Sequence, residues 1–191
     1  MRPSKFTAAM TRHLLLLFLF HTLAAAEPPP GVVVAFSDAK TQDFIGSPAL
    51  IMLPDGHYLA AHDFFGTGER HGSRIYESKD RGESWQQIAE LPDQDWSSFF
   101  LHRGTLYFMG RYWQQGKGIR QGRMAIRRSA DGGRTWTVPK DAQSGLFTIG
   151  DLRCATGPVT VVEHGGRLWR CIEHSAKGLK FPRQFQPFLY S

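Results

Sequence analysis

Short apolar segments alternate with turns rich in glycine and aspartate along most of the chain. Three pairs of segments are joined by tight turns at 54–56, 102–104 and 164–166. Short runs rich in β-branched and aromatic residues, bounded by such turns, are typical of antiparallel strands. The predicted strands are 49–53, 57–62, 74–77, 85–89, 97–101, 105–109, 123–128, 135–138, 158–163 and 167–174. We therefore predict an all-β fold.

An eight-residue phrase occurs twice, at Ser78–Trp85 and Ser129–Trp136. The copies share Ser, Asp, Gly, Ser or Thr, and Trp at the same offsets, and their tryptophans lie 51 residues apart. A fixed period of about this length indicates a repeat architecture such as a propeller or solenoid.

Each copy predicts a tight turn between two strands. Asp80 and Asp131 can accept hydrogen bonds from turn N–H groups, while Gly82 and Gly133 tolerate the positive φ that such turns need. The tryptophan that follows can pack beneath its turn. Because a catalytic aspartate has no reason to recur in every repeat, we expect both aspartates to be structural.

The phrase resembles the Asp box of sialidase-like β-propellers, which are also known as BNR-repeat proteins. The resemblance implies four-stranded antiparallel blades, at about 46–90, 96–139 and a truncated 158–191. Closed propellers have roughly four to eight blades, so we expect about two and a half blades of an incomplete propeller. Such a fragment would expose strand edges through which it could associate.

The N-terminal 26 residues have the pattern of a cleaved export signal. Arg2, Lys5 and Arg12 precede the apolar run 14–20, and three alanines at 24–26 offer a cleavage site. The apolar run is short for a bilayer core of about 30 Å, so we expect no stable membrane insertion. Residues 27–45 are interpreted as a linker with a lone strand at 32–36, and the protein as periplasmic or secreted.

Charge and cysteine content narrow the partners. The net charge of +6 falls to +3 without the leader, because the leader holds three basic and no acidic residues. We find no basic stripe or recognition motif for nucleic acid, no cysteine and histidine spacing for a metal, and expect no cofactor. Hairpin register places Cys154 far from Cys171, so a disulfide is not expected unless the chain reverses between Cys154 and Pro158.

Blade topology divides the loops between two ends of the sheets. The repeated phrases share one end with the turns at 54–56, 102–104 and 164–166. The longer loops and the blade connections lie at the opposite end, where a rigid scaffold commonly carries binding residues. We therefore look for a site at that opposite end.

Carboxylates, arginines and aromatic residues gather at that opposite end. Carboxylates can act as acid and base in glycoside cleavage, arginines can bind an anionic sugar, and aromatic rings can stack on sugars. Simpler interpretations are a strand-end hydrogen bond for His62 and Asp63, and loop packing or solvated pairs elsewhere. The predicted catalytic residues are Asp63, Glu173 and His62, the predicted substrate-binding residues are Arg70, Trp96, Arg111, Tyr112, Arg153 and Arg170, and Glu69, His71, Trp113, Asp151 and His174 fall at the same end.

Stretches 47–49, 61–66, 104–110 and 166–170 resemble uncharacterised bacterial proteins described as exo-sialidase-like. That resemblance implies an exo-α-sialidase-like glycoside hydrolase acting on a glycan, with Asp63 nearest to the acid/base aspartate of sialidases. Sialidases have an arginine two residues before the first-blade proline, where this chain has Gly46. The alternatives are a non-catalytic propeller that binds glycan or protein, and an inactive N-terminal fragment.

Overall fold

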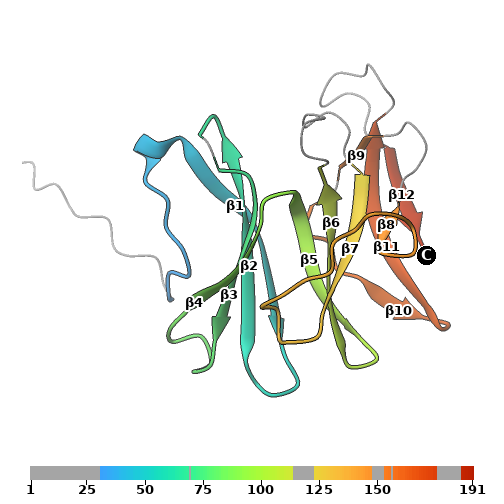
Figure 1. The fold of residues 1–191 in the computed structure, drawn as a ribbon, viewed down its shortest axis with the longest axis horizontal. Helices are drawn as coiled ribbons and strands as arrows, with labels where there is room; N and C mark the ends of the chain where they lie inside the picture. The colour runs from blue at the N-terminus through green and yellow to red at the C-terminus, as the bar shows by residue number, and fades with distance from the viewer. Residues whose placement is uncertain (1–30, 69, 114–122, 148–152, 156, 176–185) are drawn as a thin grey trace, which may run out of the picture. The chain divides into compact units, whose positions relative to one another are not determined.

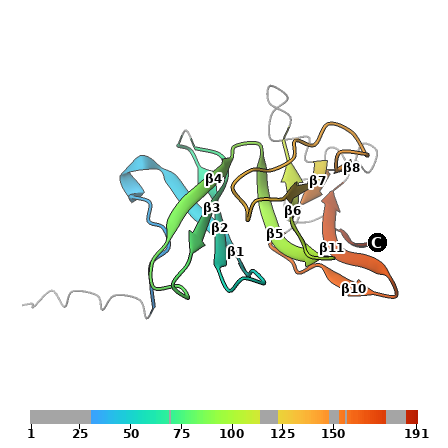
Figure 2. The same cartoon turned by 60° about the horizontal axis from the view of Figure 1, so that its bottom comes forward.

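In a computed structural model of the chain, the described residues 31–68, 70–113, 123–147, 153–155, 157–175 and 186–191 form three antiparallel sheets (Figure 1). The first holds β1 (Asp43–Met52), β2 (Tyr58–Gly66), β3 (Gly72–Ser78) and β4 (Gln86–Leu91) in this order, after a short 3-10 helix, η1 (Ala39–Thr41). The second holds β5 (Gln94–His102), β6 (Thr105–Tyr112), β7 (Arg123–Ser129) and β8 (Leu146–Phe147). Both have the strand order of an up-and-down blade, which Figure 2 shows from another side.

The third sheet is arranged differently. Its central strand is β11 (Arg167–Ser175), which pairs with β12 (Gln186–Tyr190). β10 (Val162–His164) and β9 (Arg153–Ala155) pair with opposite ends of β11. The predicted hairpin around 164–166 is therefore present, and β9 and β12 extend it beyond the sequence-based expectation.

Two predicted strands are wrong. Residues 32–36 form no strand, and their Phe36 side chain is 84% exposed. Residues 135–138 approach β7 at Thr137, which bonds with Arg127 and Arg128, and the fourth strand of the second sheet is β8 instead. The backbone of residues 124–126 in β7 is paired with residues 145–147 instead. Pro139 has no N–H to donate, so the segment 135–138 does not continue along β7.

The repeated phrases form the predicted turns, which we call the repeat turns (78–85 and 129–136). Asp80 accepts hydrogen bonds from the Ser84 side chain and backbone, and these lower the Asp80 pKa to about 2. Asp131 likewise accepts hydrogen bonds from the side chain and backbone of Thr135, and these lower the Asp131 pKa to about 2. Gly82 and Gly133 have φ values of 93° and 92°, so the positive φ predicted for both is confirmed.

An apolar core lies between the first and second sheets. Leu59 and Ile75 of the first sheet are fully buried, as is Phe108 of the second. Trp136, at the end of a repeat turn, packs against Phe108 with ring centroids 5.7 Å apart. Burying each such side chain contributes about 1.5–3 kcal/mol to stability. This core therefore stabilises the packing of the first sheet against the second. A second cluster, with Phe100, Met124 and Ile172, joins the second and third sheets.

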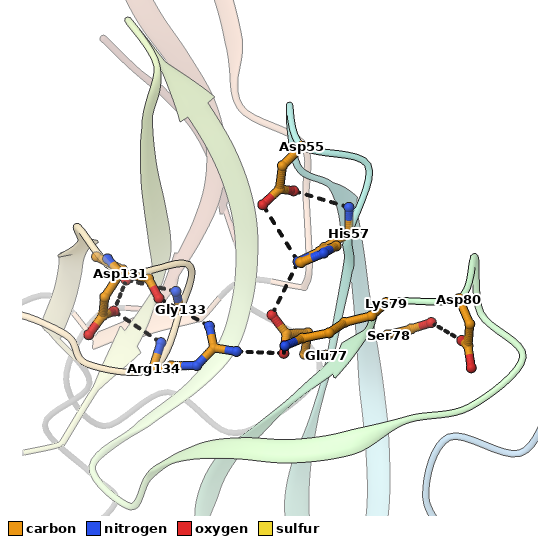
Figure 3. A network of polar contacts seen from close by, with 10 residues as sticks. Asp55, His57, Glu77, Ser78, Lys79, Asp80, Asp131, Gly133 and Arg134 are labelled. Atoms are coloured by element: carbon orange, nitrogen blue, oxygen red, sulfur yellow. Dashed lines mark hydrogen bonds and ion pairs between the residues drawn. The ribbon is translucent and has the colours of Figure 1, made fainter.

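A polar network also joins the first two sheets at the repeat-turn end (Figure 3). Arg134 donates to Glu77 of β3 at 2.6 Å, and His57 lies between Asp55 and Glu77. Burial would raise the pKa of Glu77, but the hydrogen bond and charge of Arg134, with Lys79 and His57, lower it overall. Glu77 is therefore an ionised carboxylate held by cationic neighbours.

Candidate functional site

The candidate site lies at the strand ends opposite the repeat turns, where β1 and β5 each contain a bulge. The β1 bulge falls between Gly46 and Ala49, and the β5 bulge between Asp95 and Ser98. One bulge residue in each strand has a left-handed backbone, with φ 51° at Ser47 and 50° at Trp96. Such bulges re-aim side chains and cost conformational energy, which neighbouring contacts must offset.

Asp63, near the end of β2, is buried beside these bulges. It lies opposite Gly46 in β1 and Ser73 in β3, and it is only 3% exposed. One carboxyl oxygen accepts a hydrogen bond from the Ser73 hydroxyl, and the other accepts one from the Trp96 N–H, both at 2.6 Å. Burial raises the Asp63 pKa to about 7, despite the opposing hydrogen bonds from Ser73 and Trp96.

The surroundings of Ser73 favour a protonated Asp63 on geometry alone. The Ser73 hydroxyl lies 2.6 Å from the Asp63 carboxyl and 2.8 Å from the backbone carbonyl of Gln94. A hydroxyl has one proton, so it can satisfy only one of these two acceptors when Asp63 is ionised. A neutral Asp63 can donate to Ser73 while Ser73 donates to Gln94, which satisfies all three groups.

The Trp96 peptide is held from both neighbouring sheets. Its N–H donates to Asp63 of the first sheet, and its carbonyl accepts from the Arg170 guanidinium of β11 at 3.4 Å. Arg170 also donates to the carbonyls of Met109 and Gly157, at 2.7 and 3.2 Å. The side chain is 2% exposed, and burial lowers its pKa to about 10. These contacts oppose the strain of a left-handed tryptophan.

Arg111 of β6 lies against two tryptophan rings. Its guanidinium carbon is 3.8 Å from the Trp96 ring centre and 5.0 Å from that of Trp113. Its Nε and Nη2 both donate to the carboxylate of Asp95, its cross-strand partner. The ring of His71 lies 5.7 Å from that of Trp113. We call Asp95, Trp96, Arg111, Trp113 and His71 the Trp96–Arg111 stack.

His62 lies on the other face of β2 from Asp63, as adjacent strand residues do. Its Nε2 is 3.0 Å from the Tyr76 hydroxyl, its ring packs edge-on against Phe64, and burial lowers its pKa. The structure therefore separates the two neighbours that sequence reasoning placed together.

The other predicted residues vary in their surroundings. Arg70 is half exposed and pairs with Asp43, and the ring of Tyr112 lies 5.6 Å from the Arg127 guanidinium. Burial raises the pKa of Tyr112. Glu173 is exposed on β11, where it pairs with Pro187 and Ala155. Arg153 and His174 are described only by their backbone pairing in β9 and β11, and Glu69 and Asp151 lie outside the described residues.

The structure thus brings Asp63, Trp96, Arg111 and Arg170 together, and no described contact links Glu173 to them. Sequence reasoning missed Ser73, Gln94 and Asp95. Asp95 could have been found by counting outward from the turn at 102–104, because Arg111 then falls opposite it after one bulge residue. Ser73 and Gln94 carry no comparable signal.

Neither a metal site nor a membrane-spanning helix is found within the described residues. No group of three histidine, cysteine or acidic side chains there could hold a metal ion. Nor does any helix in that part of the chain have the length and apolar character needed to cross a bilayer. Cys154 is buried, Cys171 is exposed, and both are free.

Comparison with known proteins gives a likeness of fold. No protein-family model and no curated protein sequence matches the chain. The GH93 α-L-arabinofuranosidase of Fusarium graminearum with arabinobiose matches at a TM-score of 0.51 and 16% identity, over 70% of this chain and 42% of that one. The Fusarium graminearum α-L-arabinofuranosidase Arb93A with an iminosugar inhibitor gives 0.50 and 15%, over 75% and 43%.

A Trypanosoma rangeli sialidase with sialic acid matches at 0.41 and 16% identity, over 66% of this chain and 20% of that one. The chain spans less than half the length of the two Fusarium enzymes. The two Fusarium structures are of β-propeller glycoside hydrolases, and their coverage fits an incomplete propeller. The chain therefore has the predicted fold, an incomplete sialidase-like β-propeller.

Proposed function

We propose that this chain is part of an exported glycan-active protein that hydrolyses terminal glycosidic bonds, with residues 1–26 as its cleaved export signal. The observation that carries the proposal is the buried Asp63, which has a pKa of about 7 and holds the Trp96 peptide of the Trp96–Arg111 stack. A carboxylic acid that keeps its proton near neutral pH is suited to protonate a leaving oxygen. The stack supplies aromatic surface beside that acid.

Glycoside hydrolysis needs a second carboxylate, as nucleophile or as base. Glu173 is our proposal, because it follows the hairpin glycine Gly166 by seven residues, as Asp63 follows Gly56. Asp63 pairs with Gly46 and Glu173 pairs with Ala155, each on a neighbouring antiparallel strand. The two carboxylates thus occupy equivalent positions in the first and third sheets.

The test is turnover of aryl α-L-arabinofuranosides and aryl α-sialosides by the exported protein that carries this chain. Asp63→Asn should lower kcat by about 10²–10⁴-fold, the usual contribution of a general acid. His62→Gln is the matched control, since His62 is equally buried in the same strand but faces the other way. Turnover unchanged in a folded Asp63→Asn protein would exclude Asp63 as the acid.

A second candidate function is glycan binding without hydrolysis. It is favoured by the hydrogen bonds that already occupy both carboxyl oxygens of Asp63, which is 3% exposed. In that case no glycoside is cleaved, and Trp113→Ala weakens glycan binding measured by calorimetry. Cleavage of any of the tested glycosides, lost in Asp63→Asn, would decide for the hydrolase instead.

A further inference from the structure

Resting on the proposed function, we infer that the Trp96–Arg111 stack binds an uncharged sugar through ring stacking and discriminates against carboxylated sugars. The reason is that its cation is already neutralised. Arg111 makes a bidentate pair with Asp95, and the two side chains are only 12% and 4% exposed. Binding a sugar carboxylate would require Arg111 to exchange this preorganised partner for the ligand.

Arg70, the sequence neighbour of His71, pairs with Asp43, and two buried arginines are engaged as well. Arg170 donates to three backbone carbonyls and is almost wholly buried. Arg127, 4% exposed, donates to the side chains of Asp93 and Gln94 and to a backbone carbonyl. Each guanidinium therefore serves protein acceptors, and neither presents its charge to an anionic ligand.

Gly46 contributes no charged side chain beside Asp63. Gly46 lies opposite Asp63, at the register position that Asp95 occupies in the second sheet. A Cβ at Gly46 would approach the Phe65 ring to 2.8 Å, so even alanine requires that ring to move. Asp63, which has no cationic partner across its strand pair, would meanwhile repel a sugar carboxylate whenever it is ionised.

What remains for recognition within the stack is aromatic surface and neutral hydrogen bonding. The Trp96 and Trp113 rings are both partly exposed, the Arg111 guanidinium lies over both rings, and His71 contacts the Trp113 ring. Arg111 acts here as a positioning residue, since its guanidinium lies against both rings and its charge is matched by Asp95. Rings fixed in this way lose little freedom on binding, which favours stacking on the C–H face of a neutral sugar.

Matched sugars that differ only in charge test the inference. We would titrate the full chain by calorimetry with α-1,4-galactobiose and with α-1,4-digalacturonate, and with lactose and sialyllactose. We expect each neutral sugar that binds to do so at least tenfold more tightly than its acidic counterpart. The neutral affinity should change less than twofold between 50 and 500 mM NaCl, because no ion pair with the ligand is screened.

Tighter binding of either acidic sugar, or strongly salt-dependent binding, would overturn the inference while leaving a glycan-active function intact. Binding of none of the four sugars, nor of arabinobiose, would count against the proposed function itself, and the inference would fall with it. The two failures are therefore distinguishable.

A charge variant gives a second readout. Asp95→Asn leaves the Arg111 charge unmatched, so the ratio of acidic to neutral affinity should rise at least tenfold. Asp93→Asn is the control, since it unpairs Arg127, whose guanidinium contacts neither tryptophan of the stack in the described contacts. An unchanged ratio of acidic to neutral affinity in folded Asp95→Asn protein would overturn the inference. If this variant does not fold, the salt dependence of binding by the unsubstituted chain still tests it.

Discussion

The first and second sheets place an acidic and a basic residue at the same position. Asp63 and Arg111 each follow a hairpin glycine, Gly56 or Gly104, by seven residues, and each lies beside a bulge with a left-handed residue. Across the strand pair, however, Asp63 faces glycine whereas Arg111 faces Asp95. Arg111 is therefore neutralised within its own sheet.

Asp63 has no such partner and must be satisfied by other means. It is hydrogen-bonded to Ser73 of its own sheet and to the Trp96 N–H of the next. Protonation neutralises the buried Asp63, as the ion pair with Asp95 neutralises Arg111. The comparison teaches that one register position can stabilise a blade internally or join it to its neighbour, depending on the residue across the strand.

The largest effect is expected from breaking the internal pair. Arg111→Ala leaves Asp95 buried without its cation and removes the group between two tryptophan rings. Loss of one partner of a buried pair costs about 3–5 kcal/mol, which urea unfolding would measure. The control is Arg74→Ala, whose pair with Glu90 is more exposed and should cost less than about 1 kcal/mol. Equal losses in the two variants would mean that the Asp95 pair behaves as a surface pair.

A pH series probes the protonation that replaces an ion pair at Asp63. The folded-state pKa of Asp63, about 7, lies above its ordinary value of 3.8. The folded state therefore binds the proton more tightly, and the stability this provides is complete below about pH 4 and is lost as the pH rises through 7. Between pH 4 and 7 the chain should lose about 3 kcal/mol that Asp63→Asn does not lose. Parallel stability curves for the two proteins would show that Asp63 ionises without penalty.

Much of the fold followed from local patterns in the sequence. The repeat turns and hairpins depend on residues close in the chain, such as Asp80 with Ser84, so spacing alone predicts them. The exchange of 135–138 for β8 did not follow, because the apolar pattern of 135–138 also suits a segment beside a sheet. Whether β7 pairs with 135–138 or with 145–147 depends on the path of the chain after the repeat turn, which the local pattern does not specify.

The site was less predictable, because its contacts join residues far apart in the sequence. Asp63, Trp96 and Arg111 could be placed at one end of the sheets from topology. Their partners could not, since the bond from Trp96 to Asp63 spans 33 residues and that from Arg170 to Trp96 spans 74. Such pairings depend on how sheets pack, which the pattern within one blade does not specify.

Adding a side chain at position 46 makes the two sheets more alike. In Gly46→Ala the new Cβ would meet the Phe65 ring at 2.8 Å, and this crowding should cost about 1–2 kcal/mol. Phe65 is 53% exposed, so Phe65→Leu should relieve much of that cost. A double-mutant cycle measured by urea unfolding checks the coupling. Additive effects would show that backbone conformation, and not the ring, requires glycine at this position.

The smallest effect is expected at the repeat-turn end, where the same two sheets are joined by Arg134 and Glu77. Arg134→Gln removes that ion pair, but Lys79 and His57 still surround Glu77 (Figure 3). Because Arg134 is 43% exposed, the loss should be about 1 kcal/mol or less in urea unfolding, and smaller still in high salt. Lys79→Gln, at a more exposed position on the same carboxylate, is the control and should change stability by less than about 0.5 kcal/mol. If Arg134→Gln lost as much stability as Arg111→Ala, the polar contacts at the two ends of the sheets would contribute equally. A small loss of stability would instead mean that the stronger polar contacts between the sheets lie at the bulges around Asp63 and Asp95.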